Sequence, residues 1–201
     1  MQTDAELLVA WQAGDRDAGG ALIDRYFEPL RRFFQNKIAT GVEDLIQQTF
    51  LVCVQQRDRI RDPEAFRGYL FAAARSKLYD QIGKRLRSPV APDFMVSSVV
   101  DLGVSPSEVI AEHEDQRLLI RALRTLPLEL QIALELYYVE RVRGRDLEVA
   151  LELPAGTVRS RLRRAIEQLR RSLAELSSSP EALRETTDNI DRWAAELASG
   201  E

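Results

Sequence analysis

Arginine side chains crowd one stretch of this sequence at a density that suits contact with phosphate groups. Between Ala155 and Arg171 there are six arginines and one glutamate, although the whole chain carries a net charge of −4. A guanidinium group donates paired hydrogen bonds to phosphate oxygens and to the edge of guanine. A basic segment inside an acidic protein therefore predicts contact with a phosphate-rich partner such as nucleic acid.

This stretch is predicted to be an α-helix, because its apolar residues recur at intervals of three and four and form one stripe. A helical run from Pro127 to Tyr138 and a short helix from Val142 to Leu151 precede it. A short helix, a tight turn and a basic helix predict a helix-turn-helix, whose second helix enters the DNA major groove by its N-terminal end. The residues predicted to reach bases and phosphates are Thr157, Arg159, Ser160, Arg161, Arg163 and Arg164. Taken alone, these arginines fit a solvated face of a bundle helix equally well.

A second basic helix is predicted to begin at Asp62-Pro63, an N-cap acid followed by proline at the first helical position. Its apolar stripe consists of Phe66, Leu70, Ala74, Leu78, Ile82 and Leu86. Five basic residues and one acid lie between Arg75 and Arg87. Basic residues with an aromatic ring at the start of the helix suit a surface that follows a nucleic-acid backbone and stacks one base. The candidate contacts are Arg67, Tyr69, Arg75, Lys77, Lys84 and Arg85. The alternative is a core helix with a solvated basic face.

The segment from Val42 to Gln56 is predicted to be a helix with an unusual polar face. Its buried stripe is expected to contain Leu45, Ile46, Phe50, Cys53 and Val54. The opposite face carries Asp44, Gln47, Gln48 and Gln55. Because a solvated helix face usually mixes lysine and glutamate, a glutamine-rich face hints at contact with another protein.

Composition excludes several classes of protein. A hydrophobic content of 45% with 30% charged residues is typical of globular proteins. No apolar run is long enough to span a bilayer and no basic leader precedes the first helix, so we expect a cytoplasmic location without membrane insertion. Cys53, the single cysteine, lies in an apolar run, and His113 is the single histidine. We therefore expect no catalytic site, no metal site and no cofactor.

Taken together, the motifs resemble a known family. Three segments resemble region two of bacterial RNA polymerase sigma factors. They are Gly14–Ala18, Glu43–Phe50 and Phe66–Leu70, and the last is followed by Arg75 and Asp80. Leu126–Leu162 resembles region four of the same family. The combination is similar to the small extracytoplasmic-function group, and the resemblance covers nearly everything from Asp4 to about Leu173.

The resemblance implies an all-α fold of two small helical domains joined by a flexible linker, with the helix-turn-helix in the second domain. The expected boundaries are a region 2-like domain at 1–88, a linker at 89–104, a region 4-like domain at 105–176 and an acidic extension at 177–201. The extension is predicted to contain a short amphipathic helix. Either this helix packs on one of the domains and competes with phosphate for the basic helix, or the extension serves only for packing or solubility. Fully extended, the linker reaches about 55 Å, and promoter elements two helical turns apart are separated by about 70 Å. With the widths of two domains added, both elements come within reach.

The resemblance also implies the function of a sigma factor, which binds core RNA polymerase and directs promoter recognition, strand opening and transcription initiation. Asp44, Gln47, Gln48 and Phe50 fall on the helix that docks on the polymerase clamp, and the flap is a second expected contact. The segment 57–87 falls where the family opens DNA at the −10 element. Arg159, Ser160, Arg163 and Arg164 fall on the helix that reads the −35 element. The expected partners are core polymerase, promoter DNA and an anti-sigma factor.

Some positions depart from the family pattern. Gly19 replaces a core aromatic residue, Tyr69 stands where tryptophan is usual, and Gln48 replaces a glutamate of the clamp face. Glu152 stands where the helix-turn-helix usually has glycine. The alternative function, a conventional helix-turn-helix regulator of duplex DNA, would leave the motifs at 43–50 and 66–70 unexplained.

Overall fold

The computed structural model describes residues 2–86, 92–103 and 114–177. These residues form helices and turns, with one isolated bridge between Ser98 and Pro127 instead of a sheet. The all-helical prediction is thus confirmed for this part of the chain. The first residues of the predicted region 4-like domain, 105–113, and the acidic extension from residue 178 onward lie outside the described residues.

The N-terminal half, residues 2–86, consists of four helices linked by turns. They are α1 (Asp4–Gln12), α2 (Arg16–Gln35), α3 (Val42–Gln56) and α4 (Phe66–Leu86), with 3₁₀ turns η1 (Arg57–Arg59) and η2 (Pro63–Ala65) before α4. Thr3 and Glu6 form a capping box at the start of α1. Asp15 accepts hydrogen bonds from two amides at the start of α2. The helix α2 runs through Pro29 without restarting.

Trp11 explains why a glycine replaces the aromatic residue at position 19. A Cβ atom on Gly19 would lie 2.5 Å from Nε1 of the Trp11 indole, so this ring occupies the space beside the α2 backbone. Trp11 itself is buried in the core. An aromatic side chain from α1 therefore occupies space beside the position where the family usually places one on α2.

The C-terminal half, residues 114–177, contains the helix-turn-helix. Its elements are α5 (Glu114–Thr125), α6 (Leu128–Leu134), the π-helical turn η3 (Glu135–Val139), α7 (Gly144–Leu151) and α8 (Ala155–Leu176). Leu119, Leu130 and Leu169 belong to a small core between α5, α6 and α8. The predicted run at 127–138 is helical, but its last turn is widened to a π-helix.

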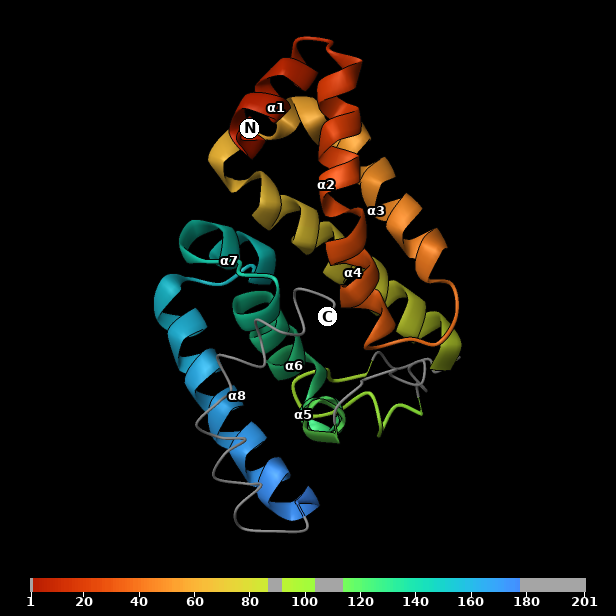
Figure 1. Ribbon diagram of the computed structural model, residues 1–201, viewed down its shortest axis with the longest axis vertical. Coiled ribbons are helices and arrows are strands. Elements are labelled where there is room, and N and C mark those ends of the chain that lie inside the picture. The colour runs from red at the N-terminus through yellow and green to blue at the C-terminus, as the bar shows by residue number, and fades with distance from the viewer. Residues whose placement is uncertain (1, 87–91, 104–113, 178–201) are drawn as a thin grey trace.

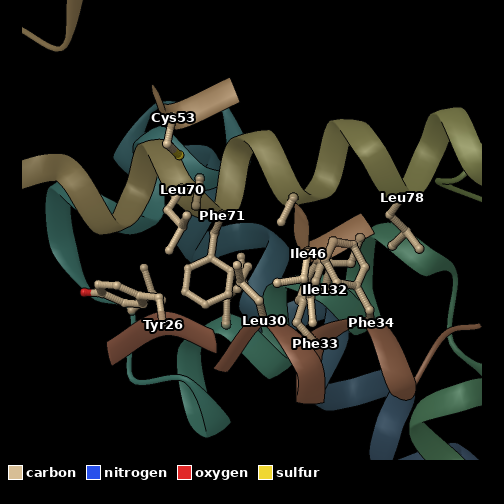
Figure 2. Close-up of a cluster of buried hydrophobic side chains, with 14 of the residues drawn as sticks. Tyr26, Leu30, Phe33, Phe34, Ile46, Cys53, Leu70, Phe71, Leu78 and Ile132 are labelled. Atoms are coloured by element: carbon tan, nitrogen blue, oxygen red, sulfur yellow. The ribbon is translucent and has the colours of Figure 1, made fainter. Parts of the chain in front are cut away.

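The two halves share one hydrophobic core. Among the described helices, α4 packs most extensively against α7, and it lies between α1–α3 and the C-terminal half (Figure 1). Ile132 of α6 inserts among Phe33, Phe34 and Ile46 of the N-terminal half (Figure 2). Burying one such side chain stabilises a structure by about 1.5–3 kcal/mol. The halves are therefore in direct apolar contact.

The described part of the predicted linker, residues 92–103, lies against both halves. The Phe94 ring stacks on Tyr79 of α4, with ring centroids 4.3 Å apart. Val99 is fully buried, and Ser98 forms the isolated bridge with Pro127 at the start of α6. In this arrangement the linker is not extended, and its side chains add to the contact between the halves.

Two adjacent glycines in α2 make a matched test of this packing. We expect Gly20→Ala to raise the free energy of unfolding by about 1 kcal/mol, because alanine is the better helix former and nothing lies within 4 Å of the new Cβ atom. We expect Gly19→Ala to lower it, because the new methyl group would overlap the Trp11 indole. Urea unfolding of both variants measures the difference, and equal effects would contradict the assigned position of Trp11.

Candidate nucleic-acid interface

The turn of the helix-turn-helix presents the N-terminal end of α8 to solvent. Glu152 ends α7 in the left-handed conformation, with φ 55°, which explains why glycine is usual at this position. Pro154 precedes α8, and the buried side chain of Val158 fixes the first turn to the core. Five of the six residues predicted to contact DNA here are exposed: Thr157, Arg159, Ser160, Arg163 and Arg164. The first turns of α8 therefore carry the expected polar and basic surface.

Arg161 has a different environment from the other predicted contacts on α8. Its guanidinium group forms an ion pair with Glu129 of α6, and both side chains are only 13% exposed. The Glu129 carboxylate also accepts a hydrogen bond from the Tyr79 hydroxyl of α4. In this arrangement Arg161 connects α8 to α6 instead of facing solvent with its neighbours.

The basic face of α4 is divided into an open and a covered part. Tyr69, Lys84 and Arg85 are exposed and Lys77 is half-buried. Arg67 and Arg75 instead contact the C-terminal half. Arg67 donates a hydrogen bond to the Glu140 carbonyl. Arg75 is 7% exposed, donates to the Leu151 carbonyl at 2.6 Å and forms an ion pair with Glu152.

A glycine allows α7 to come this close to α4. The amide of Gly68 donates a 2.8 Å hydrogen bond to Oδ1 of Asp146, in the first turn of α7. A Cβ atom at Gly68 would lie 2.5 Å from the backbone oxygen of Asp146. The motif at 66–70 therefore places a glycine where the two helix backbones meet.

Charged groups are buried where the halves meet. Lys37 is fully buried, donates to the Phe33 carbonyl at 2.7 Å and forms an ion pair with Glu135. Arg32 donates two hydrogen bonds to the Glu140 carboxylate, at 3.1 and 3.2 Å. Burial lowers the pKa of the Lys37 ammonium group and raises the pKa of the Glu140 carboxyl group. Each pair therefore carries a desolvation cost that its own contacts offset.

A cavity of about 340 Å³ opens between α3 and α4. Tyr69, Ala72, Ala73 and Ser76 of α4 line it, and Glu152 from the helix-turn-helix lines it as well. An aromatic ring beside small side chains can hold a flat ring by stacking. In this arrangement a carboxylate of the C-terminal half lies at the same cavity.

The polar face of α3 is more apolar than predicted. Asp44 and Gln47 are exposed, while Gln48 and Phe50 are half-buried, and Gln48 donates a hydrogen bond to Asp44 at 2.7 Å. The prediction that Val54 is buried is wrong, because its side chain is 42% exposed.

Leu51, which sequence reasoning did not single out, is 54% exposed. Its spacing of four residues from Gln47 and three from Val54 puts it on their face of the helix. This spacing is the signal in the sequence that could have assigned Leu51 to the exposed face of the helix. The exposed face of α3 thus combines Asp44, Gln47, Leu51, Val54 and Gln55.

The described residues show neither a reactive thiol, nor a metal site, nor a helix that could span a membrane. Burial raises the pKa of the Cys53 thiol to about 12, so this predicted core residue is not a nucleophile. Within residues 2–86, 92–103 and 114–177, no group of acids, cysteine and histidine could hold a metal ion. No described helix has the length and apolarity needed to cross a bilayer.

Two stretches of the chain match one protein family. Residues 22–88 match Sigma-70 region 2, and residues 116–169 match Sigma-70, region 4. This chain belongs to the sigma-70 family. Its relatives place this sigma factor in the extracytoplasmic-function group. It is 25% identical over 191 residues to the ECF RNA polymerase sigma-E factor of Haemophilus influenzae. The aligned region covers 87% of this chain and 97% of that protein. It is 24% identical over 176 residues to the proteins of the same name from Escherichia coli and Salmonella typhimurium, with 83% of this chain and 92% of theirs covered.

The family match assigns the biological role. As a sigma factor, the chain directs promoter recognition by RNA polymerase. A conventional helix-turn-helix regulator would account for residues 116–169 alone and would leave the match at 22–88 unexplained. That alternative is not favoured.

Proposed function

We propose that this sigma factor reads a promoter through two separate surfaces, the start of α8 at the −35 element and α4 at the −10 element, while α3 holds core polymerase. The observation that carries the proposal is the exposed basic surface at the N-terminal end of α8. This end of the second helix is the part of a helix-turn-helix that meets base edges. Arg159, Arg163 and Arg164 supply the donors, and Thr157 and Ser160 supply hydroxyl groups beside them.

On α4, the proposal assigns strand opening to the face that includes Tyr69 and the cavity beside it. A base leaving the duplex would stack on the Tyr69 ring and enter the space lined by Ala72, Ala73 and Ser76. Lys77, Lys84 and Arg85 would follow the phosphates of the same strand. Together these contacts would keep the unpaired strand from pairing again with its complement. Arg67 and Arg75 belong to the same predicted set, but in this arrangement they contact the C-terminal half.

On α3, the proposal assigns the clamp of core polymerase to the exposed face that contains Asp44, Gln47, Leu51 and Val54. Gln48 and Phe50, both half-buried, border this face. Two exposed apolar side chains amid amides and one acid suit a protein partner better than water. The region 4-like half would contact the flap. The group resemblance also implies an anti-sigma factor as a separate partner, and we propose a cytoplasmic location for the protein.

Arginines at the two ends of α8 provide the first test. We expect Arg159→Ala and Arg163→Ala each to weaken binding of the polymerase–sigma complex to duplex upstream DNA by about tenfold, because each removes a base or phosphate contact. Arg171→Ala removes the same charge from an exposed position near the other end of the helix and should change the affinity little. A promoter selected from a library by run-off transcription serves as the probe. Equal losses in all three variants would contradict the assignment.

Two equally exposed apolar residues test the polymerase face. We expect Leu51→Asp to weaken binding to core polymerase by about tenfold or more, because a charge replaces an apolar contact. Asp44→Ala should weaken it too and leave DNA contacts intact. Val9→Asp on α1 is the control, since Val9 is 53% exposed and Leu51 is 54% exposed. Competition binding with labelled core enzyme measures all three. Unchanged affinity for Leu51→Asp would show that α3 is not the docking face.

A further inference from the structure

We propose that Gln12 is a positioning residue for base selection, because its side-chain amide holds the turn η1 at the cavity between α3 and α4. The inference rests on the proposed function, in which this cavity receives a base of the promoter strand. Gln12 ends α1 and acts on the cavity through η1 rather than by lining it. It would therefore influence the promoter without touching it.

The turn η1 is the weakest of the elements that form the cavity. Helix α3 contributes Val52 and Cys53 to the lining, and α4 contributes Tyr69 with its small neighbours. The lining also includes Arg59 of η1 and Ile60 directly after it. The two helices have 15 and 21 residues and pack against each other, whereas η1 has three residues. Short 3₁₀ turns have poorer hydrogen-bond geometry than α-helices, so the position of η1 depends on contacts from elsewhere.

Gln12 supplies such a contact to both ends of the turn. Its Nε2 donates a hydrogen bond to the Arg57 carbonyl at 2.7 Å and another to the Ile60 carbonyl at 3.1 Å. The Ile60 amide donates to the same Arg57 carbonyl at 3.2 Å and closes the turn. A side-chain amide has two N–H donors, and here both serve η1. Loss of these donors would leave two carbonyls without them and release the turn from α1.

Trp11 makes the end of α1 a firm support for this contact. Its indole is buried, and it lies so close to the α2 backbone that only glycine fits at position 19. The Cζ atom of Arg57 lies 5.9 Å from the centroid of the same ring, within the range of a cation–π interaction. The last turn of α1 thus holds η1 through the backbone carbonyls and through the Arg57 side chain. The family departure at Gly19 thereby has a consequence beside the cavity.

The expected effect of Gln12 is on the choice of base. Stacking on Tyr69 accepts any base, since every base has an aromatic face. Discrimination needs polar groups at fixed positions around the edge of the base. Gln56 and Arg59 bring such groups to the lining, and Arg59 donates a hydrogen bond to Oε1 of Gln56 at 3.3 Å. A shift of η1 moves Arg59, so it should change base preference more than the strength of strand binding.

Three variants test the inference. Gln12→Met removes both donors and keeps the length of the side chain. Gln12→Lys is the rescue, because an ammonium group can donate to both carbonyls. Asp15→Ala is the matched control. It also removes two hydrogen bonds to backbone groups at a helix end, which Asp15 accepts at 2.9 and 3.2 Å at the start of α2, away from η1.

The main readout is base preference, measured with each variant bound to core polymerase. The probes are single-stranded oligonucleotides with the non-template sequence of a promoter selected by run-off transcription, and each position of the −10 element carries each of the four bases in turn. We expect wild type, Gln12→Lys and Asp15→Ala to prefer one base at one position. Gln12→Met should lower this preference by about tenfold, the size of one lost base contact. Because the preference is a ratio of affinities, the added charge of Gln12→Lys cancels.

The second readout needs no DNA. Cys53 lines the cavity and is the single cysteine of the chain. We expect a thiol reagent to modify it faster in the free Gln12→Met protein than in wild type or Asp15→Ala, because η1 no longer closes the cavity.

The outcomes separate failure of the inference from failure of the proposed function. Wild-type base preference in Gln12→Met, with weaker strand binding in Tyr69→Ala, would overturn the role of Gln12 and leave the cavity as the base site. Equal losses of preference in Gln12→Met and Asp15→Ala would overturn it too, because any loss of stability would then have the same effect. If Tyr69→Ala changed neither affinity nor preference, the cavity would not receive a base, and the assignment of α4 would fail together with the inference.

Discussion

The approach of two helix backbones at Gly68 sets the arrangement of the described chain. Because this residue has no side chain, α7 comes close enough for Asp146 to accept the hydrogen bond of an amide in the first turn of α4. The same approach brings Leu151 and Glu152 to Arg75, which fixes the turn before α8. The two basic helices α4 and α8 are therefore connected through a contact that only glycine permits.

Around this point, the balance of apolar and charged groups decides how firmly the halves are held. Ile132 packs among the aromatic rings of α2, and this burial favours the closed arrangement. The pairs of Lys37 with Glu135 and of Arg32 with Glu140 contribute less, because their desolvation opposes their attraction. The resulting contact combines apolar burial with charged pairs that fix its register.

The sequence predicted the helices and their buried faces because those depend on local periodicity. The stripe of α4 and the exposed residues at the start of α8 follow from spacing alone. The prediction that Val54 is buried is wrong because this residue lies at the margin of an apolar stripe. At that place periodicity alone does not distinguish a buried side chain from an exposed one. The contact between the halves depends on residues far apart in the chain. Arginine suits a phosphate, a carboxylate and a carbonyl equally, so nothing in the sequence showed that Arg67 and Arg75 face the C-terminal half.

Hydrogen exchange of the protein with and without core polymerase tests the central claim most directly. The account predicts that core polymerase slows exchange in α3, because docking covers the exposed face of this helix. If α3 exchanges as fast in the complex as in the free protein, α3 is not the docking face and the account is wrong.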